Sequence, residues 1–357
     1  MRARLEDVCE RDSSNLRQAD VAGRSGDYPI YGASGYIGNV DFYHQELPYV
    51  AIVKDGAGIG RTVLLPAKSS VIGTMQYLLP KKNVLPEYLC YVVRYMHLEK
   101  YFSGATIPHI YFRDYKSEEF NLVPVDYQEE IVATLGKIEA IVAARQRQLQ
   151  KLDELVKARF IELFGDMFLN SKAWKKQALD SLADVVSGIT KGRKTKEPQL
   201  IEVPYMAVSN VKDGYIDWTT VKTIQATQQE IEQYRLLPDD VLMTEGGDPD
   251  KLGRGAILKE PLQNCIHQNH IFRVRLNESL ILPAFFEEYL KHQKAKRYFL
   301  GCAKQTTGIA SINMRQLKAL PVLLPPLELQ EQFAAFVEQT DKSKVAVQTA
   351  LRKKGII

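Results

Sequence analysis

The sequence repeats itself, and this duplication constrains the fold more than any other feature. Residues 127–131 (YQEEI) recur as 329–333 (LQEQF), an offset of 202 positions. Upstream, the offset is 197 between Pro86 and Pro283, and it falls to 177 near the start of the chain. Because the offsets change in small steps and in the same order along both copies, chance does not explain them. The chain therefore holds two copies of a domain that is followed by a helix.

Each copy begins with a segment typical of a mixed α/β domain. These segments are rich in glycine, tyrosine and β-branched residues, and turn signals such as Ser34-Gly35 and Asp55-Gly56 interrupt them. In the first copy, strands are expected at 28–32, 49–53 and 62–65, and a helix at 86–101. In the second copy, strands are expected near 203–208, 240–244 and 270–275, and a helix near 283–299. Proline at the start of each expected helix suits the first helical position.

Each domain is followed by a helical segment with a coiled-coil repeat. From 128 to about 164 there is no proline, and apolar residues recur at alternating steps of four and three for about five heptads. A helix of 37 residues would be about 55 Å long, so it would extend beyond a domain of this size and act as a spacer. The residues expected to pack the two spacer helices together are Ile131, Leu135, Ile138, Val142, Leu149, Leu152, Phe333, Val337, Val347 and Leu351.

The predicted fold class is α+β, with two similar mixed domains separated by two long antiparallel coiled-coil helices in a pseudo-two-fold arrangement. The expected segments are a first domain at 1–122, a first spacer at 123–169, a second domain at 170–322 and a shorter second spacer at 323–357. The DNA backbone has the same two-fold symmetry, so two such domains could contact two half-sites separated by a gap. Because the two domains differ in most positions, their half-sites should differ too.

Composition excludes several classes of protein. No apolar run reaches the roughly 18 residues that a membrane span needs. The four cysteines are scattered without a CxxC pair, which argues against a zinc ribbon or a disulfide framework and favours a reducing cytoplasm. The net charge is only +4, and by residue count segment 1–122 is neutral while 171–322 carries +5. A partner that supplies phosphate contacts is therefore expected if the chain binds DNA.

Candidate DNA contacts are polar residues in turn-rich regions, since Arg and Gln side chains can read base edges. They are Tyr36, Lys54, Arg61, His109, Arg113, Lys191, Arg193, Lys194, Arg254, Lys304, Gln305 and Arg315. An exposed Lys or Arg is more often only solvated. Arg61 and Arg254 occupy equivalent positions in the two copies, as do Arg113 and Arg315. These two pairs suit phosphate positioning or structural ion pairs, whereas base-reading residues should differ between copies.

Catalytic and metal chemistry is not expected. The glycines at 56, 58 and 60 resemble a phosphate cradle, but the second copy does not keep their spacing, so a turn explains them better. The chain has neither a methyltransferase tetrapeptide nor a Walker A motif. Cys265, His267 and His270 lack a fourth ligand, so packing or a polar role is favoured and no metal is expected.

The layout resembles the specificity subunit of type I restriction-modification enzymes over the whole chain. The resemblance rests on the domain-to-helix junctions 122–131 and 323–332, the helix exit 158–166, the glycine turns 55–61 and 245–248, and segment 104–108. It implies two target-recognition domains that read a bipartite double-stranded DNA site, and a spacer that docks two modification (methyltransferase) subunits. It further implies restriction subunits for cleavage and no catalytic activity or cofactor in this chain, with S-adenosylmethionine bound by the modification subunits.

A different class of function stays open at this stage. A coiled-coil scaffold whose duplicated domains bind protein would also explain the repeat, and the neutral first domain is its best support. Salt-dependent binding to duplex DNA would separate the two hypotheses.

Overall fold

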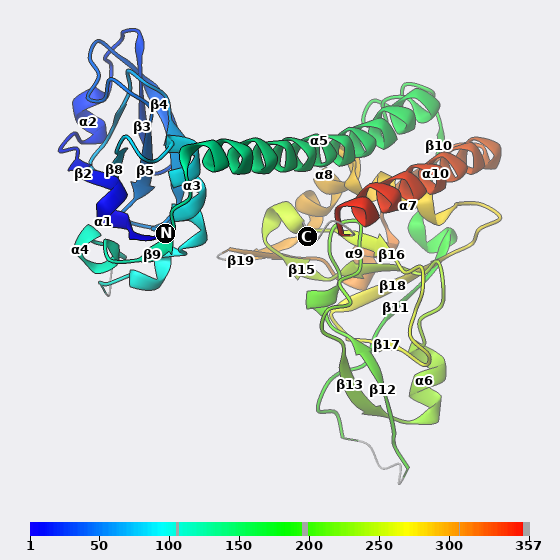
Figure 1. The fold of residues 1–357 in the computed structure, drawn as a ribbon. Helices are drawn as coiled ribbons and strands as arrows, with labels where there is room; N and C mark the ends of the chain where they lie inside the picture. Colours follow the sequence, from blue (N-terminus) through cyan, green and yellow to red (C-terminus); the bar gives the residue numbers. More distant parts are fainter. Residues whose placement is uncertain (105–106, 195–198, 307, 353–357) are drawn as a thin grey trace. The chain divides into compact units, whose positions relative to one another are not determined.

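A computed structural model describes residues 1–104, 107–194, 199–306 and 308–352, with the side chains of 250, 305, 306, 309, 351 and 352 left out. The chain divides into two compact units, residues 1–143 and 144–357 (Figure 1). Each unit is described by itself below. Among the described residues, every helix is either too short or too polar to cross a lipid bilayer.

The described residues of the first unit form three β-sheets. The largest is antiparallel, in the order β2 (Cys9–Ser13), β8 (Met75–Pro80), β5 (Tyr49–Val53), β6 (Thr62–Leu65). The second has the order β4 (Gly35–Val40), β3 (Tyr28–Gly32), β7 (Ser70–Val71), and the third pairs β1 (Arg2–Arg4) with β9 (Glu119–Asn121). All five residues of β5 are buried, which explains its unbroken apolar sequence YVAIV. The three strands expected in this copy are confirmed.

The second unit repeats the same three sheets. Its large sheet has the order β11 (Ala183–Ser187), β18 (Ile271–Leu276), β14 (Val241–Thr244), β16 (Gly255–Ile257). The others are β13 (Lys222–Ala226), β12 (Ile201–Met206), β17 (Ile266–His267), and the pair β10 (Lys175–Ala178) with β21 (Pro321–Leu324). A fourth sheet, β15 (Gly246–Gly247), β20 (Ile309–Ser311), β19 (Lys304–Thr306), corresponds to isolated bridges from Asp55 and Ser103 to His109 in the first unit. The duplication predicted from the sequence is confirmed.

Short helices complete both units. The first unit has α1 (Leu5–Val8), α2 (Gln18–Val21), α3 (Pro86–Tyr95) and α4 (Phe112–Tyr115). The second has α6 (Gln228–Tyr234), α7 (Pro283–Lys291), α8 (Gln293–Cys302) and α9 (Met314–Lys318). Single 3-10 turns lie at Leu98–Tyr101, Leu179–Ser181, Val208–Asn210 and Pro249–Lys251.

Two expected helices are shorter than the sequence predicts. The helix expected at 86–101 ends at Tyr95, because His97 adopts a left-handed conformation with φ 51°. The helix expected at 283–299 is two helices, since His292 is extended and its side chain accepts a hydrogen bond from the Lys294 N–H at the start of α8. Apolar periodicity continues through both breaks, so it could not reveal them.

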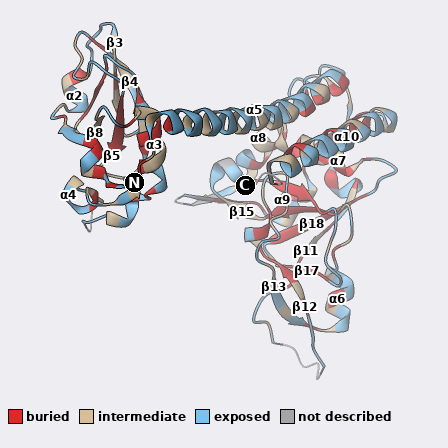
Figure 2. Cartoon of the chain, in the orientation of Figure 1, coloured by how far each residue is buried: buried red, intermediate tan, exposed pale blue. Residues whose placement is uncertain are grey.

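The long helices α5 (Val125–Phe164) and α10 (Leu327–Arg352) pack antiparallel within the second unit. Phe160 faces Phe333 with ring centroids 5.3 Å apart, and Asp153 pairs with Lys344 at 2.8 Å further along. Figure 2 shows buried residues at the end of α5 and along one face of α10. The predicted antiparallel helix pair is thus confirmed.

The residues predicted to pack the spacer helices together are more buried in the second unit than in the first. Phe333 and Val347 are buried, while Leu149, Leu152 and Val337 are half-buried. In the first unit, Ile131 and Ile138 remain 36% and 39% exposed, and Leu135 and Val142 are half-buried. The side chain of Leu351 lies outside the described residues. The heptad pattern therefore covers all of α5, although the buried apolar side chains of α5 all belong to the second unit.

A buried glutamine fixes the start of each long helix to its own domain. Gln128 accepts a hydrogen bond from the Leu85 N–H and donates to the carbonyls of Asn83 and Val123, at 2.9–3.0 Å. In the second unit, Gln330 accepts from Leu282 N–H and donates to Leu280 and Pro325 in the same way. Both side chains are fully buried. A satisfied buried amide sets direction as well as position, so each domain holds its helix in the same orientation.

Candidate nucleic-acid interface

In the first unit, the glycine-rich segment is the tight turn of the β5–β6 hairpin. Gly56, Gly58 and Gly60 all have positive φ, and a Cβ on Gly60 would lie 2.7 Å from the Glu99 nitrogen. The equivalent Gly253 also has positive φ, and a Cβ there would meet the Phe299 ring. Backbone conformation and crowding therefore account for glycine at both positions. This agrees with the turn that the sequence analysis favoured over a phosphate cradle.

Three candidate residues are linked by successive side-chain contacts beside this hairpin turn. Lys54 is 3.8 Å from the Asp55 carboxylate, whose other oxygen lies 2.6 Å from Nδ1 of His109. His109 stacks against Tyr111, and the Arg113 guanidinium lies over the Tyr111 ring at 4.7 Å. Segments more than fifty residues apart thus place Lys54, His109 and Arg113 together. The resulting surface offers cations, hydrogen-bond donors and a π-face, a combination that suits nucleic acid.

Of the other two candidates in this unit, Arg61 lies near that surface and Tyr36 lies away from it. Arg61 is exposed at the exit of the hairpin turn, and its backbone carbonyl accepts from the Val53 N–H. Tyr36 lies in β4 on a different sheet, where its hydroxyl donates to Asn39 at 2.9 Å. The sequence analysis did not select Asp55 and Tyr111, which connect these cations. Asp55 directly follows Lys54 and Tyr111 lies between His109 and Arg113, so closeness to candidate residues in the sequence could have indicated both.

The corresponding edge of the second unit uses different side chains. Lys304 is exposed in β19, whose partner β20 also pairs with β15. Glu245, which precedes β15, lies 2.5 Å from Nδ1 of His270. Arg254 is half-buried at the exit of the β14–β16 connection, and its buried Nε has no hydrogen-bond partner in the described part of the chain. A histidine–carboxylate pair therefore recurs at this edge, built from positions that are not equivalent in the two copies.

The basic loop at 189–194 separates into two kinds of residue. Lys191 and Lys194 are exposed. Arg193 instead forms an ion pair with Glu230 of α6 and donates to the Gln225 carbonyl at 3.1 Å. This contact raises the pKa of Arg193 and lowers that of Glu230. Arg193 therefore ties the loop to the domain and presents Lys191 and Lys194 to solvent.

The remaining candidates are placed as follows. Arg315 is exposed in the first turn of α9, two residues after the Asn313 cap. Gln305 belongs to β19, but its side chain lies outside the described residues. Of the three residues considered as metal ligands, Cys265 and His267 are fully buried, and His270 is exposed and paired with Glu245. Among the described residues, no group of three or more His, Cys, Asp or Glu is arranged to hold a metal ion.

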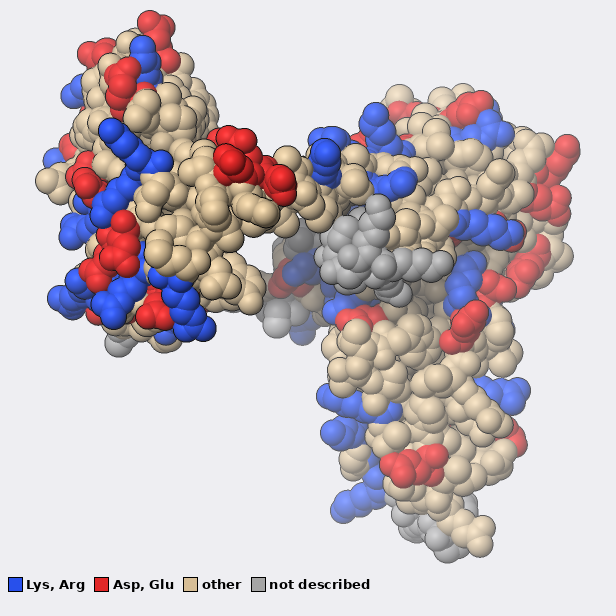
Figure 3. All heavy atoms as spheres, in the orientation of Figure 1, with Lys and Arg blue, Asp and Glu red and all other residues tan. Residues whose placement is uncertain are grey.

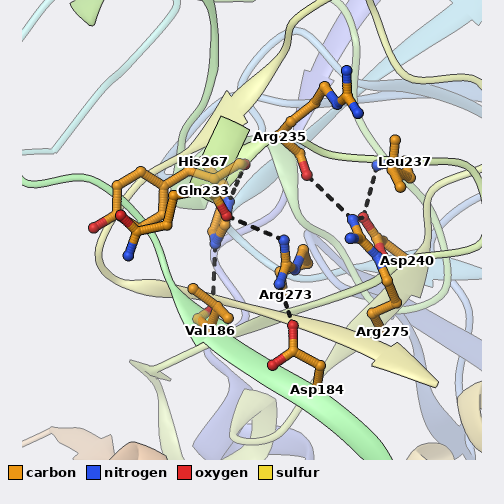
Figure 4. A network of polar contacts seen from close by, with 10 residues as sticks. Asp184, Val186, Gln233, Arg235, Leu237, Asp240, His267, Arg273 and Arg275 are labelled. Atoms are coloured by element: carbon orange, nitrogen blue, oxygen red, sulfur yellow. Dashed lines mark hydrogen bonds and ion pairs between the residues drawn. The ribbon is translucent and has the colours of Figure 1, made fainter. Parts of the chain in front are cut away.

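A partly buried polar network holds β18 against the segment around α6 (Figure 4). Arg273 donates to Asp184 at 2.5 Å and to the Gln233 carbonyl at 3.3 Å. Arg275 binds Asp240 with two hydrogen bonds of 2.7 and 2.8 Å, and Asp240 also accepts from the Leu237 N–H. A bidentate contact such as that between Arg275 and Asp240 is strongly orienting. These contacts join the large sheet of the second unit to residues 233–240, which include the end of α6.

The equivalent strand position in the first unit carries an unlike side chain. By the strand registers, Tyr77 on β8 occupies the position of Arg273 on β18. The Tyr77 hydroxyl accepts a hydrogen bond from the Val71 N–H of the small sheet at 2.9 Å. At this position the second unit links its large sheet to Gln233 of α6, whereas the first unit links its large sheet to its small sheet.

Acid should destabilise the second unit through His267. Burial lowers the pKa of His267 from 6.5 to about 4, although its two ring nitrogens lie near the Tyr234 and Val186 carbonyls. Between these pH values the unfolded chain binds a proton that the folded chain excludes, so stability decreases as the pH falls from 6.5 to 4. The full difference corresponds to about 3 kcal/mol. Denaturant unfolding at several pH values measures it.

The variant His267→Gln should lose this part of the pH dependence. His97→Gln is the matched control, because His97 is exposed and the wild-type dependence should survive there. An unchanged pH dependence in His267→Gln would contradict the assignment.

Charges of both signs lie on the face of the first unit that Figure 3 shows. On the face in view in Figure 3, Lys and Arg side chains lie among Asp and Glu side chains. This matches the neutral balance of 1–122 and shows no single-sign patch on that face.

Comparison with known proteins identifies the family. The model described as "Type I restriction modification DNA specificity domain" matches twice, at residues 1–154 and 171–354. The chain therefore belongs to this family, with two recognition domains, as the junction motifs suggested.

Relatives and solved structures agree with this assignment. A putative type I restriction enzyme MjaX specificity subunit from Methanocaldococcus jannaschii is 29% identical over 169 residues, which are 47% of this chain and 39% of the relative. The EcoKI specificity subunit of Escherichia coli is 23% identical over 253 residues, 66% and 53% of the two chains. The matches thus span roughly two fifths to a half of these relatives' own lengths.

The fold is shared with the S subunit of a type I restriction-modification system from M. genitalium. The TM-score is 0.61 at 15% identity, and the match covers 99% of this chain and 92% of that one.

Proposed function

We propose that this chain gives DNA sequence specificity to a type I restriction-modification system. Each unit reads one half of a bipartite double-stranded site, and the helices set the unread gap. The observation that carries the proposal is the repetition of one three-sheet domain with its helix in a chain of this family. A protein-binding scaffold, the other class considered, is not favoured because the matching family is a DNA specificity domain.

The proposal assigns catalysis to partner subunits. In it, two modification subunits dock on the helices and bind S-adenosylmethionine, restriction subunits add cleavage, and this chain holds no cofactor and works in the cytoplasm. A structural neighbour with TM-score 0.54 comes from work on assembly of the type I R-M system, which supports multi-subunit partners. The modest net charge of +4 also supports shared phosphate contacts.

Methylome sequencing of cells with and without this chain tests the proposal. Adenine methylation at one split site, with two unlike half-sites, should depend on the chain. Methylation at a contiguous site, or methylation that persists without the chain, would overturn it. Purified chain mixed with modification subunits should give a complex of one specificity to two modification subunits.

The lysines of the 189–194 loop should contribute phosphate contacts. Lys191→Ala and Lys194→Ala should each weaken DNA binding about equally for all sequences and reduce the slope of log affinity against log salt by about one. Salt-titrated fluorescence anisotropy on the assembled complex measures both effects. Lys157→Ala, an exposed lysine on α5, is the control. A loss confined to particular DNA sequences would instead assign base reading.

A further inference from the structure

Each unit places an exposed histidine against a carboxylate at the same end of its large sheet. In the first unit, Nδ1 of His109 lies 2.6 Å from Asp55, and 37% of the His109 side chain is exposed. In the second, Nδ1 of His270 lies 2.5 Å from Glu245, and 56% of the His270 side chain is exposed. The carboxylates lie just beyond β5 and β14, the equivalent inner strands. Exposed pairs contribute little to stability, so a role in binding explains them better.

The pair of the second unit has no counterpart in the first. The Lys54 N–H donates to the Thr74 carbonyl, and the Glu245 N–H donates to the His270 carbonyl, both at 3.0 Å. Lys54 therefore corresponds to Glu245, and Thr74 corresponds to His270. The first unit thus has a lysine and a threonine where the second has the carboxylate and the imidazole.

The pair of the first unit likewise has no counterpart in the second. A bridge joins Asp55 to His109, and the equivalent strand pairing of the second unit joins Gly246 to Ser311. An ion pair inherited from the duplication would occupy the same positions in both copies. Each domain has its own pair instead, as expected of residues that read unlike half-sites.

The carboxylate determines which ring nitrogen of the histidine carries the proton. An ionised carboxylate only accepts hydrogen bonds, so Nδ1 donates, and a neutral ring then has an unprotonated Nε2. In the described part of the chain, Nε2 of His109 has no hydrogen-bond partner. Nε2 of His270 lies 3.4 Å from Nδ2 of Asn269, which is a donor and so agrees with an acceptor at this atom. Each unit thus has a histidine nitrogen that accepts hydrogen bonds.

We propose that each histidine accepts a hydrogen bond from the exocyclic amino group of an adenine or a cytosine in the major groove, one in each half-site. Asp55 and Glu245 are positioning residues that keep Nε2 unprotonated. In this groove adenine N6 and cytosine N4 donate hydrogen bonds, whereas guanine O6 and thymine O4 accept them. A fixed acceptor therefore favours amino bases and disfavours keto bases. The inference rests on the proposed DNA specificity and adds which base edge these side chains recognise.

Cations beside each histidine suit contacts with the DNA backbone. Lys54 lies 3.8 Å from the Asp55 carboxylate. In the second unit the exposed Lys304 belongs to β19, which shares its sheet with β15. Phosphate contacts fix the register of a protein on DNA, and base contacts then specify the sequence. Both kinds of contact are therefore available at this end of each domain.

Removal of single amino groups from the DNA site tests the proposal in the assembled complex. Methylome sequencing first defines both half-sites of the wild-type chain. Duplexes are then made in which each adenine or cytosine is replaced in turn by the analogue without its amino group, purine or 2-pyrimidinone deoxyriboside. Anisotropy at about pH 8, where a free imidazole is neutral, measures binding of the chain with its modification subunits. A replacement in each half-site should weaken binding about tenfold, because it leaves the histidine acceptor unpaired.

Variants of the first unit link that effect to its histidine. His109→Ala should make binding insensitive to the amino group at one position of one half-site. Asp55→Asn should lower discrimination between amino and keto bases at the same position about tenfold, since an asparagine amide can donate to Nδ1 and shift the ring proton to Nε2. The other half-site should be read as before. Circular dichroism and thermal unfolding check that each variant is folded.

A variant of the second unit and a control complete the test. Glu245→Gln should lower the discrimination at one position of the opposite half-site only. Asp41→Asn neutralises an exposed carboxylate of the first unit that pairs with Arg24 instead of a histidine, and it should leave both half-sites unchanged.

The outcomes distinguish this inference from the proposed function. If the chain directs methylation to a split site but His109→Ala and Asp55→Asn keep the wild-type base preference, the inference alone is overturned. A loss of affinity that is equal for all bases would also overturn it, since that result indicates a phosphate contact or a structural role. If no split site depends on the chain, the proposed function fails as well.

Discussion

Phe164→Ala should lower the free energy of unfolding of the second unit by about 3–5 kcal/mol, the range measured when a buried phenylalanine is replaced by alanine. The ring is fully buried and lies 4.9 Å from Phe285 and 5.6 Å from Phe333. The surrounding side chains come from α5, α7 and α10, so the cavity cannot close without moving a helix. For a unit of this size, the melting temperature should fall by about 10 °C.

Ile161→Ala is the matched control for this prediction. Ile161 lies three residues before Phe164 on the same helix and is 55% exposed. Alanine favours a helix at such a position, so calorimetry should show little change. A loss below about 1 kcal/mol in Phe164→Ala would mean that the end of α5 is not part of the core.

Inserting one heptad between Ala143 and Ala144 should lengthen the gap in the recognised DNA site by about three base pairs. Seven residues add about 10.5 Å to a helix, and the rise of DNA is about 3.4 Å per base pair. The insertion point lies at the division between the two units within α5. Neither domain changes, so both half-sites should stay the same. Methylome sequencing of cells carrying the variant reads half-sites and gap together.

A substitution of equal length controls for the altered sequence. Replacing residues 140–146 with other helix-forming residues keeps the helix length, and the gap should remain that of the wild type. If the heptad insertion left the gap unchanged while methylation continued, α5 would not set the spacing.

How far the sequence predicts the site depends on the range of the interaction. Lys54 and Arg113 were selected as candidates from the sequence, but the contacts through Asp55, His109 and Tyr111 connect residues more than fifty positions apart. Arg193 illustrates the opposite case. It was chosen as an exposed cation in a basic loop, and the structure engages it with Glu230, thirty-seven residues away.

The sequence by itself determined the duplication, three strands of each copy, the helix that follows each domain and the family. These features are periodic or local, so composition and spacing record them. Only the tertiary structure decided that α3 ends at Tyr95, before the left-handed His97, and that Gln128 and Gln330 fix the starts of the long helices. Those outcomes depend on side chains that meet across distant segments, where burial and hydrogen-bond satisfaction act, and no local pattern encodes such meetings.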